Sequence, residues 1–402
     1  MAKLCIDDLK LSGKRILIRV DFNVPMNEQG MITDDTRIRA ALPTINYAVQ
    51  HGAKVLLISH LGRPKGNPSL KFSLRPAAER LATLLGNPVG MAEDCVGSGV
   101  KARIDRMAAG QVMLLENCRF HLEEEKNDEE FSRALAELCD LYVNDAFGTA
   151  HRAHASTVGV TRFVSQSASG FLMQKELVQL GALLDHPKRP FIAILGGAKV
   201  SDKIGVLANL LPKVDSLLIG GGMAYTFLKA QGQEVGSSRV EADGLKIAQE
   251  TMEQAGRSNV AIHLPSDHVI AERIDAHAST MQVEGSIPIG SMGLDIGPAT
   301  ISRFIREIER ANTILWNGPM GVFELLPFRE GTFALAKAVA AGHAHSVIGG
   351  GDTAAAVSLA GVAEQMTHIS TGGGASLEFL EGKELPGIAA LTDKSEGIGG
   401  TV

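Results

Sequence analysis

The sequence predicts an α/β protein with two parallel-sheet domains, and three observations support this prediction. Short apolar runs alternate with amphipathic helical segments along the chain, and the alternation restarts after a proline-containing segment at 185–190. The length of 402 residues also favours more than one hydrophobic core. Strands separated by helices indicate a parallel sheet that is covered by helices on both faces.

In the first half, four short apolar runs are predicted as buried strands because they lie between helical patterns. They are RILIRV (15–20), KVLLIS (54–59), VMLLE (112–116) and LYVND (141–145). Apolar stripes at helical spacing predict a helix from about Asp34 that ends at Gly52, a second after Ser73, which can cap it, and a third from Phe131 to Leu138.

A long apolar-striped helix from about Phe171 to Leu184 ends in the segment DHPKRP at 185–190. Two prolines and several charges within six residues are typical of a boundary, because proline cannot continue a helix. We therefore place the domain junction at this segment.

The second half contains five predicted strands, and nearly every one runs directly into glycines. The strands are FIAIL (191–195), SLLIG (216–220), TILWN (313–317), HSVIG (345–349) and THIST (367–371), and the loops are GGAK, GGGM, NGPMG, GGGDT and TGGGAS. Open α/β sheets bind ligands at the carboxyl ends of their strands. Glycines let backbone N–H groups approach phosphate oxygens, so several such loops predict a nucleotide site.

Polar residues beside these glycines have more than one interpretation. Asp352 and Thr353 fit either a helix amino-terminal cap or contacts with a nucleotide's metal and phosphates. Lys199 and Lys203 stand four residues apart at the predicted start of a helix, a spacing that would aim both amines at a phosphate. Lys203 could also be a solvated surface lysine, whereas Lys199, between glycines and a valine, is the better candidate.

The strand ends of the first half carry basic and polar side chains instead of glycines. Any one of them could be a solvated surface group, but together they predict a site for a small, highly anionic ligand, since guanidinium matches carboxylate and phosphate geometry. Asp21 could recognise the ligand or only pair with an arginine. No nucleophile with an adjacent acid is evident near His60, which favours ligand binding over base catalysis. The candidates are Arg19, Asp21, Asn23, Arg37, His60, Arg63, Arg119, His151 and Arg152.

Composition excludes several classes of function. A net charge of −6 supplies no basic field for nucleic acid. No apolar run approaches the roughly 18 residues of a membrane-spanning helix. The start, MAKLCIDDLK, lacks the features of a secretory signal, so a cytoplasmic protein is expected. The 4 cysteines lie far apart, which indicates buried thiols and argues against a zinc site or a disulfide framework.

These motifs, in this order, resemble the phosphoglycerate kinase family over residues from about Leu11 to Leu391. The resemblance rests on RILIRVDFNVP, TRIRAALPTI, ISHLGRP, LLENCRF, NDAFGTAHRAHAS, ILGGAKVSDKI, GGGMAYTFL, ILWNGPMGVFE, GGGDT and STGGGASLEFLEGK. It implies a glycolytic kinase that transfers a phosphoryl group reversibly between 1,3-bisphosphoglycerate and ADP, giving 3-phosphoglycerate and ATP. The implied transfer is direct and in line, with magnesium as cofactor.

The resemblance also implies two Rossmann-like domains, joined by a hinge helix, that close around the substrates of a monomeric enzyme. Residues 1–170 would bind phosphoglycerate, residues 171–190 would form the hinge helix and linker, and residues 191–385 would bind the nucleotide. The tail, about 386–402, would return to the first domain.

Individual site residues follow from the same resemblance. Phosphoglycerate would be bound by Asp21, Phe22, Asn23, Arg37, His60, Leu61, Gly62, Arg63, Arg119 and Arg152. The nucleotide would be bound by Lys199, Lys203, Gly293, Asn317, Glu324, Gly350, Gly351, Asp352 and Thr353, with Asp352 as the magnesium ligand. The catalytic positions would be Arg37, Lys199, Gly350 and Gly373. A carboxylate nucleophile is already ionised at neutral pH, so this reaction needs no general base.

Two other functions remain open. An NAD-dependent dehydrogenase could use a similar two-domain frame, but the spaced-glycine fingerprint is not found after the first strand. A non-catalytic nucleotide-binding protein could keep the same fold, although it could dispense with the charges of Arg37 and Lys199.

Overall fold

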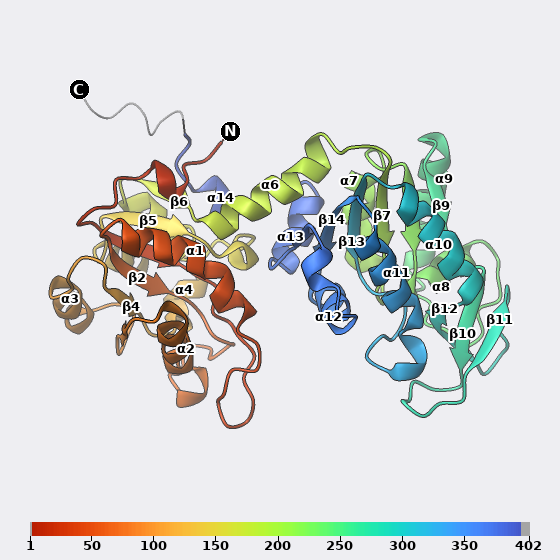
Figure 1. The fold of residues 1–402 in the computed structure, drawn as a ribbon, viewed down its shortest axis with the longest axis horizontal. Coiled ribbons are helices and arrows are strands. Elements are labelled where there is room, and N and C mark those ends of the chain that lie inside the picture. Colours follow the sequence, from red (N-terminus) through yellow and green to blue (C-terminus); the bar gives the residue numbers. More distant parts are fainter. Residues whose placement is uncertain (1, 395–402) are drawn as a thin grey trace. The chain divides into compact units, whose positions relative to one another are not determined.

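The computed structural model describes residues 2–394, which divide into two compact units (Figure 1). Unit 1 comprises the described residues up to Leu177 together with those from Glu384 onward, and unit 2 comprises Val178–Lys383. Residues 395–402 of the predicted returning tail lie outside the described residues.

Unit 1 contains one sheet of six parallel strands in the order β3-β4-β2-β1-β5-β6. The strands are β1 (Arg15–Arg19), β2 (Lys54–Ile58), β3 (Val89–Met91), β4 (Val112–Leu114), β5 (Leu141–Asn144) and β6 (Ser167–Ser169). The four predicted strands are confirmed. The edge strands β3 and β6 were not predicted, because each has only three residues, too few to give a clear apolar pattern.

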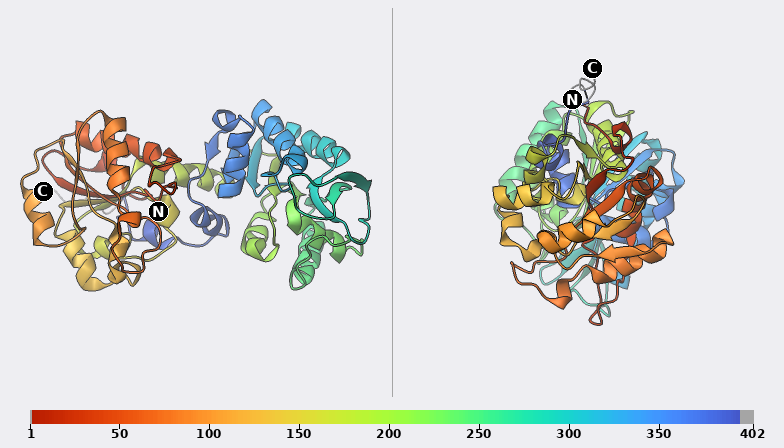
Figure 2. Two further views of the ribbon diagram at one scale, coloured as in Figure 1. Left: turned by 90° about the horizontal axis from the view of Figure 1, so that it is seen from below. Right: turned by 90° about the vertical axis from the view of Figure 1, so that its left-hand side faces the viewer.

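Alternation along each strand builds two apolar cores, one on each face of this sheet. Ile16 and Ile18 belong to one core, with side chains of α1 (Thr36–Gln50) and α2 (Arg75–Leu85). Leu17 belongs to the other, with side chains of α3 (Ser98–Asp105) and α5 (Glu129–Ala136). Figure 2 shows the sheet between these helices. The fold is therefore the predicted parallel α/β layer arrangement.

Shorter helical segments complete unit 1. They are α4 (Leu122–Glu125), α14 (Pro386–Ala389), and the 3₁₀ turns η1 (Ile6–Asp8), η2 (Leu70–Phe72), η3 (Cys118–Phe120), η4 (Phe147–Thr149) and η5 (Gly159–Phe163). The prediction that Ser73 caps α2 is wrong: Leu74 occupies the cap position. The Ser73 hydroxyl accepts from the N–H of Arg75, the first residue of α2, at 3.3 Å and donates to Glu116 Oε2 at 2.7 Å.

The segment that follows Lys383 packs against the start of the chain. Leu4 N donates to Thr392 O at 2.9 Å, and Lys3 Nζ donates to Ala389 O at 2.9 Å. Gly387 N donates to Ala150 O at 2.8 Å. Figure 1 shows α14 beside the amino-terminal segment. Residues distant in sequence thus complete one unit.

Unit 2 contains a second sheet of six parallel strands, in the order β15-β14-β13-β7-β8-β9. The strands are β7 (Phe191–Leu195), β8 (Ser216–Ile219), β9 (Ala261–His263), β13 (Thr313–Asn317), β14 (His345–Gly349) and β15 (His368–Ile369). All five predicted strands are confirmed, although the last is two residues long. Both sheets give the expected Rossmann-like α/β class.

A separate three-stranded antiparallel sheet, in the order β11-β10-β12, belongs to unit 2. Its strands are β10 (Asp267–Ala271), β11 (Met281–Glu284) and β12 (Met292–Ile296). The sequence prediction missed this sheet. Strand β11 is largely exposed and polar, and the apolar residues of the buried β10 and β12 are interrupted by histidine, glycine and aspartate, so none gives a continuous apolar run.

The helices of unit 2 lie mostly in the connections between strands. They are α7 (Ile204–Leu210), α8 (Gly221–Ala230), α9 (Gly244–Arg257), α10 (Pro298–Arg310), α11 (Glu330–Ala341), α12 (Gly351–Leu359) and α13 (Gly374–Leu380), with 3₁₀ turns η6 (Ser201–Lys203), η7 (Leu326–Phe328) and η8 (Ala363–Gln365). Side chains of α10, α11 and α12 share one apolar core with one face of the sheet.

Helix α6 (Phe171–Asp185) contains the division between the two units. Its first turn is anchored in unit 1: the N–H groups of Leu172 and Met173 donate to Asp145 Oδ1 at 2.9 and 3.1 Å. Burial raises the pKa of Asp145 to about 6. Asp145 follows β5 directly, so this strand end fixes the start of the helix that leaves unit 1.

Other predictions concern the cysteines and membrane association. The cysteines Cys5, Cys95, Cys118 and Cys139 are buried free thiols, as predicted. Within the described part of the chain, no helix combines the length and apolar character that crossing a membrane requires.

Candidate functional sites

The first site, in unit 1, begins at the end of β1. Asp21 Oδ2 accepts a hydrogen bond from Arg37 Nη1 of α1 at 2.6 Å, so the predicted pairing of this acid with an arginine is present. Asn23 Oδ1 accepts from Gly62 N at 2.9 Å. These two contacts tie the turn after β1 to a helix start and to the turn after β2.

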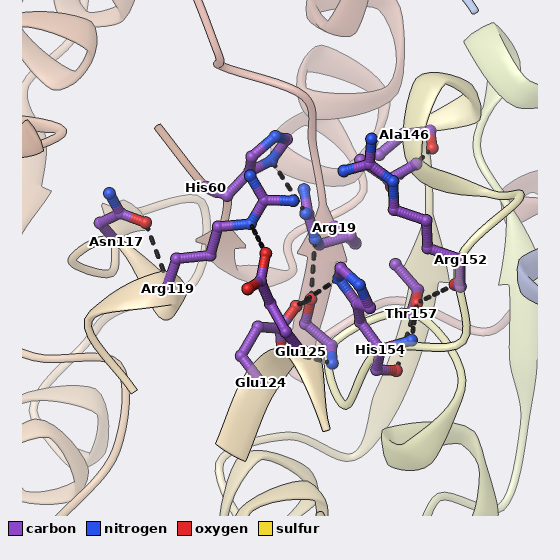
Figure 3. Close-up of polar contacts among 12 residues, drawn as sticks. Arg19, His60, Asn117, Arg119, Glu124, Glu125, Ala146, Arg152, His154 and Thr157 are labelled. Carbon is purple, nitrogen blue, oxygen red and sulfur yellow. Dashed lines mark hydrogen bonds and ion pairs between the residues drawn. The ribbon is translucent and has the colours of Figure 1, made fainter. Parts of the chain in front are cut away.

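Arg119 extends this arrangement from the loop after β4. It lies on η3, is only 6% exposed, and donates through Nη1 to Gly62 O at 2.8 Å. Its Nε lies 3.1 Å from Glu125 Oε1, and Asn117 Oδ1 accepts from the Arg119 N–H at 3.1 Å. Figure 3 shows the contacts of Arg119 with Asn117 and Glu125. A nearly buried guanidinium is thus held in one orientation.

His60 lies among the arginines and is almost fully buried. Burial, followed by the positive charges of Arg19, Arg119, Arg152 and Arg37, holds the pKa of His60 well below its ordinary value. The imidazole is therefore uncharged at neutral pH, which supports the prediction that it binds a ligand without accepting a proton. Each of these four arginines therefore lies within electrostatic reach of His60.

The remaining predicted residues of this site differ in accessibility. Arg63 is exposed, and Arg152 is partly buried with its Nε donating to His151 Nε2 at 3.1 Å. Phe22 and Leu61 are buried in the apolar core, so a ligand could meet only their backbone. Arg19 is also buried, at 1% exposed, which sequence reasoning about surface arginines did not anticipate.

The second site, in unit 2, lies where strand order reverses between β7 and β13, the usual ligand position in an open α/β sheet. There the backbones after both strands are in close contact: Gly197 N donates to Pro319 O at 3.2 Å. A Cβ on Gly196 would lie 2.1 Å from Pro319 O. A Cβ on Gly318, whose φ is +104°, would lie 2.3 Å from Gly196 C. Only glycine allows this contact.

The two predicted lysines differ in environment, and the alternative that Lys203 is a solvated surface lysine is wrong. Lys199 is exposed, whereas Lys203 is 8% exposed and donates through Nζ to Asn317 Oδ1. Burial lowers the pKa of Lys203 to about 8. The expected shared helix face is wrong, because α7 begins only at Ile204, after a 3₁₀ turn. Ile204, the first residue of α7, is 42% exposed.

Asn317 carries an unpaired donor beside the glycine loop after β14. Its Nδ2 is buried and has no hydrogen-bond partner among residues 2–394. A Cβ built on Gly349 or Gly350 would lie 3.0 or 3.3 Å from this nitrogen. Buried donors are almost always paired in native proteins, so Nδ2 of Asn317 is a donor that a ligand oxygen would satisfy.

The cap interpretation of Asp352 and Thr353 is wrong, because Gly350 occupies the cap position of α12 and neither side chain caps it. The Thr353 hydroxyl is fully buried and accepts from Gly318 N at 2.7 Å, so it joins the loops after β13 and β14. Asp352 is exposed in the first turn of the helix. Its carboxylate therefore remains available to a hard cation such as magnesium.

Three further predicted residues also lie in unit 2. Gly293 is on β12, donates through N to Ser238 Oγ at 2.9 Å, and leaves no room for a Cβ, which would lie 2.0 Å from the hydroxyl of Tyr225. Glu324 is exposed, and Gly373 precedes α13 with φ +51°. The place of Gly293 in the fold was not predicted, because the antiparallel sheet that contains β12 was not predicted.

A third group of polar residues lies outside both predicted sites. Ligand-type atoms of Asp94, Cys95 and His121 lie within 4.8 Å of one another. The cysteine spacing did not predict this group. Burial raises the pKa of Cys95 well above its ordinary value, and His121 Nε2 pairs with Asp94 Oδ1 at 2.7 Å. The group is a hydrogen-bonded imidazole and carboxylate beside a protonated thiol.

Known proteins resemble the whole chain. A family model described as phosphoglycerate kinase matches residues 6–383. The phosphoglycerate kinase of Koribacter versatilis is 60% identical over 403 residues, which cover 98% of this chain and 100% of that protein. The phosphoglycerate kinase of Anaeromyxobacter sp. (strain K) is 58% identical over 396 residues, which cover 98% of this chain and 100% of that protein.

Solved structures of phosphoglycerate kinases are also similar to this chain. The phosphoglycerate kinase structure from Coxiella burnetii aligns with a TM-score of 0.88 at 43% identity, over 96% of this chain and 98% of that one. The phosphoglycerate kinase structure from Pyrococcus horikoshii OT3 aligns with a TM-score of 0.84 at 35% identity, over 96% of this chain and 98% of that one.

Proposed function

The chain belongs to the phosphoglycerate kinase family, and on that premise we propose how its two sites divide the reaction. The protein is an enzyme of glycolysis that transfers a phosphoryl group reversibly between 1,3-bisphosphoglycerate and ADP, giving 3-phosphoglycerate and ATP. The dehydrogenase and the non-catalytic nucleotide-binding protein considered from the sequence are not supported, because the family match spans nearly the whole chain.

We assign phosphoglycerate to the site of unit 1. The support is a set of arginines around an uncharged, buried histidine, with Arg37 oriented by Asp21 and Arg119 by the Gly62 carbonyl. Guanidinium groups bind carboxylate and phosphate through paired N–H donors, and a fixed fork loses little entropy on binding. Arg63 and Arg152 would complete the set.

We assign the nucleotide to the site of unit 2, and the orphan Nδ2 of Asn317 is the observation that carries this assignment. It lies beside the glycine loop after β14, while its Oδ1 accepts from the buried ammonium of Lys203. Phosphate oxygens would satisfy both the amide donor and the lysine charge.

We further propose that Asp352 holds the magnesium ion of the nucleotide. The donor chemistry fits, since magnesium is usually bound by one or two carboxylates together with substrate phosphates. When bound, the ion neutralises charge on the phosphate chain. Glu324, Gly293 and the backbone of Gly351 are assigned to the rest of the nucleotide.

The chemical step needs alignment and charge neutralisation more than proton transfer. The 3-phosphoglycerate carboxylate is ionised at neutral pH and can attack the γ-phosphate directly. We propose that Arg37 and Lys199, with the backbone of Gly350 and Gly373, stabilise the charge on the transferred group. Because the two substrates must meet, we also propose closure at the hinge segment 171–190.

A coupled assay of ATP-dependent phosphorylation of 3-phosphoglycerate tests the activity, and folded protein without turnover would refute it. The division of the sites is tested by a matched pair of variants. Arg63→Ala should raise the KM for 3-phosphoglycerate alone, and Lys203→Met should raise the KM for ATP alone. The opposite pattern would contradict the assignment. Light scattering and cell fractionation test the monomeric, cytoplasmic state that we also propose.

A further inference from the structure

Arg19 is more deeply buried than the other arginines of the unit 1 site, at 1% exposed, and each of its guanidinium nitrogens has a partner within the protein. Nε donates to Ser156 Oγ at 2.8 Å, Nη1 donates to Val20 O, and Nη2 lies 3.1 Å from His60 Nδ1. Figure 3 shows the guanidinium reaching His60. Arg19 is placed to act on His60, not on a ligand.

The charge of Arg19 is balanced through a hydroxyl. The Ser156 hydroxyl that accepts from Arg19 donates in turn to Glu124 Oε1 at 2.6 Å, and Ser156 N donates to Glu124 Oε2 at 2.9 Å. Glu124 is fully buried. A buried guanidinium is tolerated only when it is paired and hydrogen-bonded, so Glu124 and Ser156 fix both its charge state and its orientation.

The contact between Arg19 and His60 determines where the imidazole proton lies. A guanidinium has N–H donors and no acceptor, so Nη2 must donate to Nδ1. Nδ1 must therefore carry a lone pair, which places the proton of the neutral ring on Nε2. A proton on Nδ1 would set two donors against each other at 3.1 Å.

We propose that Arg19, held by Ser156 and Glu124, is a positioning residue that fixes His60 in its Nε2–H tautomer. His60 then offers an uncharged N–H donor to an anionic oxygen of phosphoglycerate, among arginines that supply the charge. This inference rests on the proposed assignment of His60 to the phosphoglycerate site.

Nitrogen NMR of the protein labelled with ¹⁵N-histidine tests the tautomer directly, with His60→Gln identifying the His60 signals. The wild type should show a protonated Nε2 and an unprotonated Nδ1. In Arg19→Met the ring should lose this single tautomer, and the KM for 3-phosphoglycerate should rise about tenfold, the loss of one oriented hydrogen bond. The KM for ATP should stay within about twofold, because its site is in unit 2.

Ser156→Ala removes the hydroxyl bridge and keeps the test usable if Arg19→Met does not fold; it should shift the tautomer and the KM in the same direction. Glu124→Gln should do the same, whereas Glu123→Gln, the same change at an exposed neighbour on α4, should leave both unchanged. A wild-type proton on Nδ1, or an unaltered His60 spectrum in the folded Arg19 and Ser156 variants, would overturn the inference.

The tautomer and the function of His60 can fail separately. If the Arg19 and Ser156 variants change the spectrum but His60→Gln leaves the KM for 3-phosphoglycerate unchanged, the positioning role stands and the assignment of His60 to the substrate is wrong.

Discussion

The two sites are built from different parts of the chain: side chains form the one in unit 1, and backbone forms much of the one in unit 2. In unit 1, orientation comes from chains of hydrogen bonds such as Asp21 to Arg37. In unit 2, orientation comes from glycines whose backbones are in contact, such as Gly196 and Gly318. One buried lysine, Lys203, donates to Asn317 at the end of β13.

This difference determines how each site can be altered. A site made of arginines changes its charge when one side chain is replaced, while the backbone beneath can remain in place. A site made of touching backbones has few side chains to remove, so it is altered mainly by adding a Cβ where none fits. We therefore expect substitutions in the unit 1 site to reduce catalysis and substitutions in the unit 2 site to reduce folding stability.

The largest expected effect is on the side-chain site. Arg37→Ala should lower kcat by a factor of about 10³, because a guanidinium that neutralises the transferred phosphoryl group is lost, while ADP affinity changes little. Steady-state kinetics and ADP titration measure the two quantities. Arg39→Ala is the control, since Arg39 lies on the same helix and pairs with Asp35 at 2.8 Å. Near-normal kcat in Arg37→Ala would refute its proposed role.

An added methyl group tests the backbone site. Gly318→Ala should lower the free energy of unfolding by about 3 kcal/mol, since both its φ of +104° and the backbone of Gly196 oppose a Cβ. Gly62→Ala in unit 1 should cost less, because its Cβ would meet the movable Phe72 ring.

Urea denaturation with Gly256→Ala as control measures this difference. Gly256 lies in α9 with nothing within 4 Å of a built Cβ, so alanine there should be neutral or stabilising by up to about 1 kcal/mol. Equal losses in Gly318→Ala and Gly62→Ala would remove the contrast between the two sites.

The smallest expected effect concerns the one buried charge of the second site. The pKa of Lys203 is lowered to about 8, so the free enzyme carries this charge below pH 8 and loses it as pH rises further. ADP affinity should therefore fall above pH 8, by at most about tenfold per pH unit. Calorimetric titration from pH 7 to 10 measures this slope. Lys203→Met should bind weakly without the slope, and a flat wild-type profile would contradict the assignment.

Local pattern predicted most of the framework. Strands such as Phe191–Leu195 and Thr313–Asn317 are buried on both faces, so they read as continuous apolar runs that end in glycine. The exposed, polar β11 gave no such signal, and the position of Gly293 was lost with it. A single sequence predicts strands that form continuous apolar runs, and it does not predict strands that lack such a run.

Polar residues were predicted by type but not by environment. Lys203 is buried because it ends a 3₁₀ turn and contacts Asn317, a residue more than a hundred positions away in the chain. Arg19 is buried because Ser156 and Glu124 come from other segments to balance it. Such partners are set by tertiary structure, so no local spacing could distinguish these side chains from exposed ones.

The contact between the amino-terminal segment and residues 384–394 has a consequence for synthesis. Unit 1 needs Thr392 and Ala389 to pair with Leu4 and Lys3, and these partners leave the ribosome after all of unit 2. Unit 2 is contiguous and can complete its own core earlier. The half of the enzyme that is translated first is therefore the half that finishes folding last.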